Sequence, residues 1–382
     1  MTRPQALRLG INLLYLVPGE TGGTEVYARE LVPQLAALRP GEPISLFACE
    51  ELAEELRTNP WCEEQRLVAL PVPGRTRARR VAGEQTLLPL AVSRSGVDVL
   101  HSLATTAPAV LTAKNVVTIH DLIYKHFPET HSGLLGRGMS MLVPLSARRA
   151  TRIVASAEAV RDDMVRFLGT PPEKIDVVYH GAGAEPTATP TEERELRARL
   201  QLGRSPIVFS PSAKRAHKNL GRLIDAFARV DGDPAPVLVI PGYATGLEED
   251  LVGRARAAGV EDRVRFTGWL SQEDLEGIYR AAEFMAFPSL AEGFGFPVVE
   301  AMRRGTPVLT SNVPTLAEVS AGAALTVDPL SVDDLAAAMN RLIADPALRA
   351  DLVERGRVRA AELSWERCAE LTMATYRRAQ AN

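Results

Sequence analysis

Cysteine is scarce in this sequence, and long apolar runs are missing. The three cysteines, Cys49, Cys62 and Cys368, are far apart and show no metal-ligand spacing. Reduced thiols of a cytosolic protein explain them better than disulfides or metal ligands. The most apolar early segment, Leu7–Val17, is too short to span a membrane and has no small-residue cleavage site after it. We therefore predict a buried strand there and expect a cytoplasmic protein.

Strong charge of either sign is absent as well. The formal net charge is −3 over 382 residues, which gives no global attraction to nucleic acid or to anionic lipid. We therefore expect no nucleic-acid partner, and any contact with a charged surface must be local. A hydrophobic content of 46% with 24% charged residues is typical of a soluble globular protein, and the length favours two domains.

Short β-branched runs alternate with helical patterns through the first half of the chain. Helices are predicted at Val26–Leu38 and Ala159–Leu168. The predicted strands are Leu7–Val17, Ile44–Ala48, Leu67–Leu70, Val97–His101, Val116–His120, Ile153–Ala155 and Ile175–Tyr179. Such alternation indicates βαβ units and a mainly parallel sheet. We predict a Rossmann-like N-terminal domain over residues 1–185.

A second α/β series follows a stretch of small residues and prolines, 181–190, which is typical of a linker. Its predicted strands are Ile207–Ser210, Val237–Ile240, Val264–Thr267, Phe284–Pro288 and Thr306–Thr310. Helices are expected between them, and three more between residues 331 and 378. The fold class is thus α/β, with a second Rossmann-like domain over residues 186–364.

The stretch Pro288–Asn312 has the features of a ligand site. An apolar strand precedes it, Gly293 and Gly295 interrupt it, and Pro297 suits the first turn of a helix. A strand, a glycine loop and a helix start form the place where an α/β sheet binds ligands.

Two carboxylates flank this glycine loop. Glu292 should project from the loop, and Glu300 should lie in the first helical turn. Backbone N–H groups from Gly293 through Phe294 and Gly295 to Phe296 suit a phosphate. A carboxylate beside a phosphate needs neutral hydroxyls as partners, so we expect a ribose at Glu300 and a second polyhydroxy group at Glu292. Together these groups describe a nucleotide sugar.

Glu292 and Glu300, with Gly-Phe-Gly-Phe-Pro between them and Gly-Thr-Pro-Val after, resemble the Glu-x7-Glu motif of family 4 of the retaining glycosyltransferases. The alternative is a solvated βα turn of an ordinary doubly wound domain. The resemblance implies the GT-B fold, with two Rossmann-like domains facing each other across a cleft. It also implies that the last helix, residues 365–382, returns to pack on the first domain.

The loop Ser210–Asn219 carries three cations, Lys214, Arg215 and Lys218. Fixed cations at this place would stabilise a diphosphate leaving group. Members of the family carry an arginine and a lysine here, and Lys218 matches the lysine. The family's usual Gly-Arg-Leu is replaced, so either Lys214 or Arg215 fills the other role. Solvated loop charge is the alternative.

Three residues of the N-terminal domain are further candidates. Gly22 and Gly23 open a helix and would let the backbone approach a phosphate or sugar; a tight turn alone is the other interpretation. His120 ends a buried strand, where a structural histidine is the commoner finding. The resemblance places a histidine of this strand end beside the transferred sugar, with Asp121 orienting a loop.

The basic run Arg75–Arg80 is interpreted first as a solvated loop. The other interpretation is contact with an anionic acceptor, such as a phosphate-bearing lipid or glycan, or peripheral contact with the inner face of a membrane.

The resemblance implies a retaining hexosyltransferase. It would move a mannose- or glucose-like sugar from a GDP- or UDP-linked donor to a hydroxyl of a glycan, lipid or small molecule. No cofactor and no metal are expected, because the loop cations would stabilise the leaving group. The alternatives are another GT-B enzyme, a glycosyl phosphorylase or a sugar-nucleotide epimerase, and a catalytically silent nucleotide-sugar-binding module.

Overall fold

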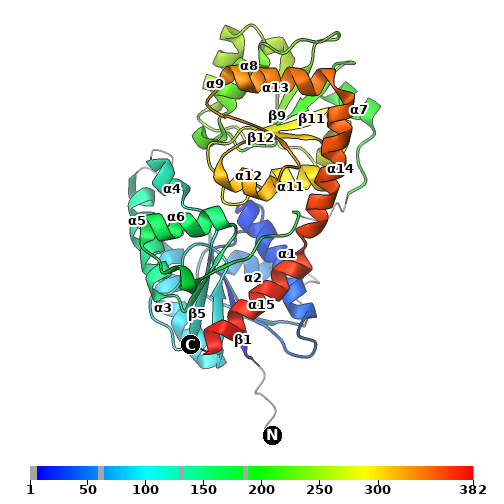
Figure 1. Ribbon diagram of the computed structural model, residues 1–382. Helices are drawn as coiled ribbons and strands as arrows, with labels where there is room; N and C mark the ends of the chain where they lie inside the picture. Colours follow the sequence, from blue (N-terminus) through cyan, green and yellow to red (C-terminus); the bar gives the residue numbers. More distant parts are fainter. Residues whose placement is uncertain (1–6, 59–63, 129–132, 184–187, 382) are drawn as a thin grey trace. The chain divides into compact units, whose positions relative to one another are not determined.

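The computed structural model describes residues 7–58, 64–128, 133–183 and 188–381 (Figure 1). The chain forms two compact units: unit 1 comprises Met1–Gly181 and Leu363–Asn382, and unit 2 comprises Ala182–Glu362. Cys62 and the middle of the predicted linker, residues 184–187, lie outside the described residues.

Unit 1 is built on a parallel sheet of seven described strands in the order β3-β2-β1-β4-β5-β6-β7. The strands are β1 (Leu9–Leu13), β2 (Ser45–Ala48), β3 (Arg66–Ala69), β4 (Val99–Ser102), β5 (Lys114–Ile119), β6 (Arg152–Ala155) and β7 (Ile175–Val177). The helices are α1 (Gly23–Ala37), α2 (Glu50–Leu56), α3 (Arg77–Ser95), α4 (Ile123–His126), α5 (Gly133–Arg149), α6 (Glu158–Leu168) and α15 (Trp365–Ala381). This strand order is the Rossmann order, as predicted.

Helix α15 belongs to unit 1, although all of unit 2 precedes it in the sequence. It contacts α1 and strands β4 to β6, and Figure 1 shows it, in red, beside α1. Trp365, Cys368 and Tyr376 of this helix are buried, and the Tyr376 hydroxyl lies 2.7 Å from Nδ1 of His101. The buried face of α15 therefore completes the core of this unit.

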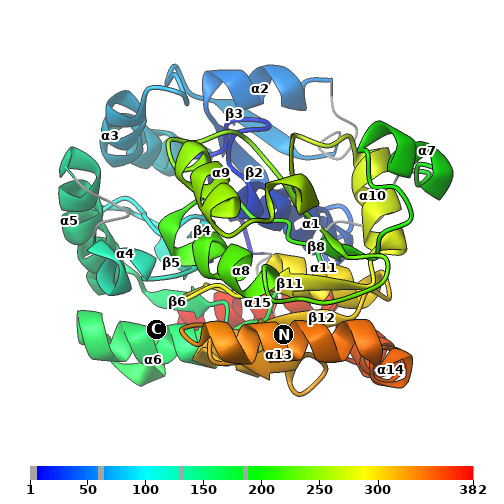
Figure 2. The ribbon, with the colours of Figure 1, turned by 90° about the horizontal axis from the view of Figure 1, so that it is seen from above.

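Unit 2 repeats the architecture with a parallel sheet of six described strands in the order β10-β9-β8-β11-β12-β13. The strands are β8 (Ile207–Phe209), β9 (Val237–Pro241), β10 (Val264–Gly268), β11 (Phe284–Phe287), β12 (Val308–Ser311) and β13 (Leu325–Val327). The helices are α7 (Glu193–Arg199), α8 (Leu220–Phe227), α9 (Glu248–Ala257), α10 (Gln272–Ala281), α11 (Phe296–Arg303), α12 (Pro314–Ser320), α13 (Val332–Ala344) and α14 (Pro346–Glu362). Helix α13 lies beside α8 over a core cluster that includes Leu223, Leu335 and Met339 (Figure 2).

The loop prediction for Arg75–Arg80 is wrong in its second part, because Arg77 begins α3. Leu88 and Val92 of α3 are buried one turn apart, and Gly96 ends the helix with a left-handed φ of 66°. This apolar periodicity begins beyond the arginines, so the charged first turn does not reveal the helix in which it lies.

None of the described helices combines the length and the apolar character needed to cross a bilayer.

Candidate active site

The segment that joins β11 to α11 in unit 2 turns sharply at Gly295. Its φ of 90° is in the left-handed region, and a Cβ there would lie 2.5 Å from Cδ2 of Leu316. Glycine meets both demands without strain. Pro297 follows in the first turn of α11, where its missing N–H has no helical partner to lose. The predicted order of strand, glycine turn and helix start is present at the carboxyl end of β11.

The two aromatic residues of this segment support the turn. Phe294 is buried, and its ring meets that of Phe296 edge to face with centroids 5.4 Å apart. Gly293 is buried beside Phe294. The ring contact packs the loop against the start of α11 and so determines the position of the backbone of residues 293–296.

Lys218 and Glu292 meet directly, although 74 residues separate them. Nζ of Lys218 lies 2.6 Å from Oε1 of Glu292, and the two side chains are only 15% and 9% exposed. The ammonium also lies 4.9 Å from the centroid of the Phe287 ring. Because the pair is largely shielded from water, its charges interact more strongly than those of a surface pair.

Asn219 ties together the two loops that carry this pair. It adopts a left-handed conformation with φ 60°, which asparagine tolerates, at the start of α8. Its side-chain amide donates to the carbonyl oxygens of Pro288 at 3.1 Å and of Pro329 at 2.7 Å. The N–H of Leu290 donates to the carbonyl of His217 at 2.7 Å. These bonds hold the loop of Lys218 against the loop of Glu292.

Glu300 is the fifth residue of α11 and so falls just beyond the first turn, where it was predicted, because the helix begins at Phe296, one residue before Pro297. The hydroxyl of Tyr279 donates to its Oε2 at 3.3 Å. Gly183, with φ 72°, passes so close that a Cβ there would overlap the Glu300 side chain. Loss of water around the carboxylate raises the pKa of Glu300, which the nearby Arg304 partly offsets.

Lys214 and Arg215, the two candidates for the second cation, differ in their surroundings. The Lys214 side chain is fully buried: its Nζ pairs with Glu248 at 2.9 Å and donates to the carbonyl oxygens of Gly242 at 2.7 Å and Tyr243 at 3.2 Å. All three donors of that ammonium are therefore used within unit 2. Arg215 is exposed at the start of the 3-10 turn that ends in Lys218.

In unit 1, His120 directly follows β5 and is buried. Its Nε2 donates to the carbonyl of Leu103 at 2.7 Å, which leaves Nδ1 to accept from Nε2 of His180 at 3.2 Å. Burial lowers the pKa of both rings, so both are neutral near pH 7. Each nitrogen of His120 thus bonds another protein group, and Asp121 accepts the N–H of Ile123, which orients the following turn.

Gly22 and Gly23 stand at the start of α1. Gly22 has φ 63°, a Cβ there would meet no atom within 4 Å, and its carbonyl accepts the N–H groups of Glu25 and Val26. The Glu25 carboxylate accepts the N–H of Gly19 at 3.0 Å. Glycine at position 22 therefore permits the left-handed turn into α1 and leaves open space beside it.

No group of three or more histidine, cysteine, aspartate or glutamate residues is arranged to hold a metal ion in the part of the chain that the structure describes.

Two family models match consecutive parts of the chain. "Glycosyltransferase Family 4" matches residues 21–185, and "Glycosyl transferases group 1" matches residues 192–359. The first match falls on the sheet of unit 1 and the second on the sheet of unit 2. The chain belongs to the GT-B glycosyltransferases.

Several curated relatives of this glycosyltransferase are themselves named as mannosyl- or glycosyltransferases. It is 29% identical over 266 residues to the O-antigen chain mannosyltransferase B of Escherichia coli, with 69% of this chain and 70% of the relative covered. It is 32% identical over 303 residues to a D-inositol 3-phosphate glycosyltransferase of Rhodococcus opacus, with 77% and 65% covered. The aligned part spans 55% of a third relative, an MMP α-(1→4)-mannosyltransferase of Mycolicibacterium hassiacum that is 33% identical.

Solved structures share the fold over nearly the whole chain. The sucrose-phosphate synthase of Thermosynechococcus elongatus has a TM-score of 0.78 at 22% identity, with 97% of this chain and 98% of that one covered. The Anabaena protein HepE, solved with UDP and glucose, has a TM-score of 0.74 at 19% identity, with 97% and 100% covered. These likenesses bear on the fold alone.

The sequence predictions did not include several groups that the structure places beside the candidate residues. Tyr279 bonds Glu300, and Arg304 forms an ion pair with Glu276 at 2.5 Å under the same helix. Tyr279 and Glu276 lie on α10 and Arg304 directly follows α11, and no motif surrounds any of them. The only hints in the sequence are the aromatic residue Tyr279 and the four-residue spacing from Glu300 to Arg304. Both features are common on ordinary helices, so they do not indicate a site.

Proposed function

We propose that this glycosyltransferase transfers a hexose, with retention of anomeric configuration, from a nucleoside diphosphate sugar to an acceptor hydroxyl. The observation that carries the proposal is the contact of Lys218 with Glu292, which lies in the loop before α11. It brings a cation suited to a diphosphate beside a carboxylate suited to sugar hydroxyls, in the same unit and next to the same glycine turn.

In the proposed complex, the donor binds unit 2. Its diphosphate lies along the backbone of residues 293–296 at the start of α11, where the helix dipole favours negative charge. Glu292 accepts hydrogen bonds from hydroxyls of the transferred sugar, and Glu300 accepts them from the ribose. The raised pKa of Glu300 fits a carboxylate that has few water contacts and gains hydroxyl partners when the donor binds.

The cations supply charge stabilisation to the leaving group. As the bond from the anomeric carbon to the diphosphate oxygen breaks, its electron pair stays with the diphosphate, and Lys218 stabilises the added charge. Arg215 is the second cation, because it is exposed on the same turn whereas the donors of Lys214 are engaged. The acceptor oxygen bonds the anomeric carbon from the face that the diphosphate leaves, and its proton passes to a diphosphate oxygen.

The comparisons narrow the choice of donor. Two of the first relatives are named mannosyltransferases, and a structural neighbour was solved with UDP and glucose. A GDP-linked mannose and a UDP-linked glucose are therefore the first donors to test. Unit 1 would present the acceptor, a hydroxyl of a glycan, a lipid-linked glycan or a small molecule.

Two measurements test this function. Thermal unfolding is measured with GDP-mannose, UDP-glucose, GDP and UDP. One nucleotide sugar and its own nucleotide should stabilise the protein, since a ligand at a hundred times its Kd adds about 2.7 kcal/mol to the free energy of unfolding. NMR of the product from that donor should show the anomeric configuration of the donor sugar. An inverted product would refute the retaining mechanism. Sugar phosphate formed from inorganic phosphate without nucleotide would instead indicate a phosphorylase.

A further inference from the structure

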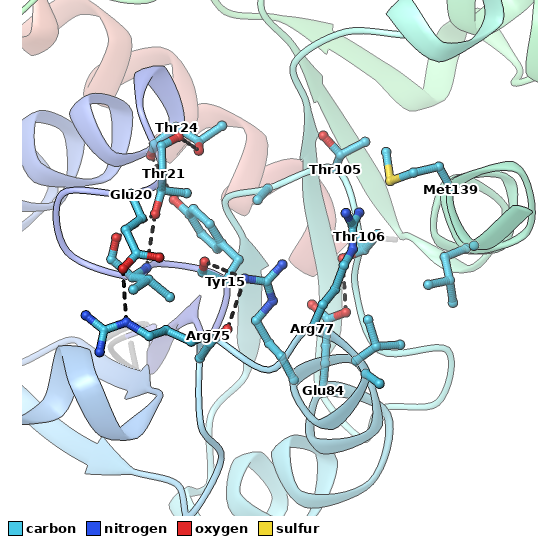
Figure 3. A pocket seen from close by; sticks show the side chains of 18 of the residues that line it. Tyr15, Glu20, Thr21, Thr24, Arg75, Arg77, Glu84, Thr105, Thr106 and Met139 are labelled. Atoms are coloured by element: carbon cyan, nitrogen blue, oxygen red, sulfur yellow. Dashed lines mark hydrogen bonds and ion pairs between the residues drawn. The ribbon is translucent and has the colours of Figure 1, made fainter. Parts of the chain in front are cut away.

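Unit 1 contains a cavity of about 850 Å³ that is lined by three arginines of the basic run Arg75–Arg80 and by none of the residues predicted to bind the donor. Its polar walls come from three segments: the stretch from β1 to the first turn of α1, the residues after β4, and α3 with the loop before it (Figure 3). Glu20, Thr21 and Thr24 come from the loop before α1 and from its first turn, and Thr105 and Thr106 follow β4. Arg75, Arg77, Arg80 and Glu84 come from the start of α3 and the loop before it, and Tyr15 follows β1. The volume suits a ligand of one or two sugar rings.

Positive charge in this cavity exceeds negative charge, since three arginines face two glutamates. Arg75 forms an ion pair with Glu20 at 2.9 Å. Arg80 donates to the carbonyl oxygens of Tyr15 at 3.1 Å and Gly74 at 3.3 Å. Among the described residues, no acid lies within ion-pair distance of Arg77. The Arg80 guanidinium is thus held by neutral carbonyl groups, and that of Arg77 has no direct counter-charge among the described residues.

Arg77 and Arg80 also act on each other. They are one helical turn apart on α3, and both line the cavity. Partial loss of water and the positive charge of Arg80 lower the pKa of Arg77. Two like charges that face one space raise each other's energy, and a bound anion relieves this repulsion.

The floor of the cavity holds a fixed polar group. Glu84 is 7% exposed, accepts from the side-chain amide of Asn12 at 2.9 Å and accepts from the hydroxyl of Thr106 at 3.0 Å. Figure 3 shows Arg77 extending from the start of α3 toward Thr106, above Glu84. A ligand in this space would meet a cation on one side and hydroxyl and carboxylate groups below, which is the pattern that an anionic polyol needs.

We propose that this cavity binds the acceptor and that Arg77, assisted by Arg80, holds a phosphate group on it. The inference rests on the proposed transfer to an acceptor hydroxyl and adds the chemical class of that acceptor: a phosphorylated sugar or polyol. The phosphate comes either from a free sugar phosphate or from the diphosphate of a lipid-linked sugar. The apolar side of the cavity, with Val17, Met139 and Leu142, accommodates the first carbons of such a lipid as well as the face of a sugar ring.

Two substitutions on the same helical turn separate this role from a general effect of charge. Arg77→Gln removes the guanidinium charge and leaves a shorter, neutral polar side chain. Arg79→Gln removes an equal charge from an exposed position that does not line the cavity. Arg77→Gln loses a charge-assisted hydrogen bond to phosphate and should bind the phosphorylated ligand about tenfold or more weakly. Arg79→Gln should bind that ligand as the parent protein does.

Methionine methyl groups report which unit a ligand occupies. Met139 and Met141 line the cavity in unit 1, whereas Met302 lies on α11, the helix of Glu300, in unit 2. The full-length protein, labelled at its methionine methyl groups, is titrated with glucose 6-phosphate, with methyl α-glucoside as the uncharged match, and with farnesyl diphosphate-linked glucose. In a separate titration with UDP and GDP, the methyl signal of Met302 is followed as the reporter of unit 2.

The expected result is a shift of the Met139 and Met141 signals by the phosphorylated ligands, with little effect of the methyl glucoside. Tighter binding of the farnesyl compound would identify the lipid-linked source, and equal binding the free sugar phosphate. Equal binding of charged and uncharged sugars, unchanged affinity in Arg77→Gln, or shifts confined to Met302 would overturn the proposal. Failure of both nucleotides to shift Met302 would count against the donor site alone.

Discussion

At the level of single residues, the contacts around Lys218 fix the position of its ammonium. Its ammonium is paired with Glu292 at 2.6 Å, with the Phe287 ring nearby, and little water reaches it. A preorganised charge of this kind needs no rearrangement when negative charge develops on a leaving group. The same shielding makes the two partners depend on each other, because a buried charge without its partner is costly.

Lys218→Ala should lower kcat by about 10²-fold or more, the scale of losing one preorganised stabilising group. Steady-state transfer at saturating donor measures this change, and a thermal melt verifies that the variant folds. Lys114→Ala, at an exposed position of unit 1, is the matched control and should keep full activity. Turnover of Lys218→Ala within a few-fold of the parent enzyme would refute the assigned role.

Glu84 provides a prediction on pH. Burial raises its pKa above the ordinary value of 4.5, and the hydrogen bonds from Asn12 and Thr106 offset this only partly. The folded protein therefore holds a proton on Glu84 more tightly than the unfolded chain does. Its contribution to stability is complete below about pH 4.5 and is lost as the pH rises through the folded pKa.

Relative to Glu84→Gln, the parent protein should lose stability as the pH rises from about 4.5 toward neutrality. Urea unfolding of both proteins at a series of pH values measures the difference in the free energy of unfolding. Ionisable groups that titrate alike in both proteins cancel in that difference. A difference that stays constant over this range, or grows in favour of the parent protein, would contradict the prediction.

At the scale of elements, the turn into α11 depends on one glycine. Gly295→Ala should cost about 1–3 kcal/mol, because alanine resists the left-handed φ of 90° and its Cβ would press on Leu316. Denaturant unfolding measures the loss. Gly253→Ala, on an exposed face of α9 with no atom within 4 Å of the new Cβ, is the control and should be neutral or slightly stabilising. Equal stability of the two variants would contradict this account.

Most of the elements could be predicted from local pattern. Apolar runs such as Ile153–Ala155 become strands because the inner strands of a parallel sheet are buried on both faces. Helix α10 begins at Gln272. The hydroxyl of Ser271 caps it by accepting the N–H of Asp274, and a serine before an apolar periodic segment is a common N-cap. Among the elements that were not predicted, strand β13 has three residues, and helix α12 has seven and no side-chain cap.

At the scale of the whole molecule, residues distant in the sequence complete each unit. The Tyr376 hydroxyl on α15 bonds His101 on β4, and burial lowers the pKa of that ring to about 3. Tyr376→Ala should therefore cost about 3–5 kcal/mol in unit 1. Hydrogen exchange should show loss of protection in β4 and β5 and none in β8 and β9.

Tyr243→Ala is the matched control, since that ring is 60% exposed in unit 2, and it should change stability by no more than about 0.5 kcal/mol. Equal loss of protection in both units of Tyr376→Ala would show that they unfold as one body.

Local pattern was enough to predict the two parallel sheets and the glycine turn before α11, because periodicity, proline and glycine act over a few neighbouring residues. It also placed Lys218 and Glu292 at strand ends. The meeting of these two side chains depends on the folded chain, as do the contacts of the Lys214 ammonium with Glu248 and two carbonyl groups. The same holds for Arg77, which lines a cavity and has no acid within ion-pair distance among the described residues. Such pairings depend on side-chain packing between segments far apart in the chain, and no local pattern encodes them.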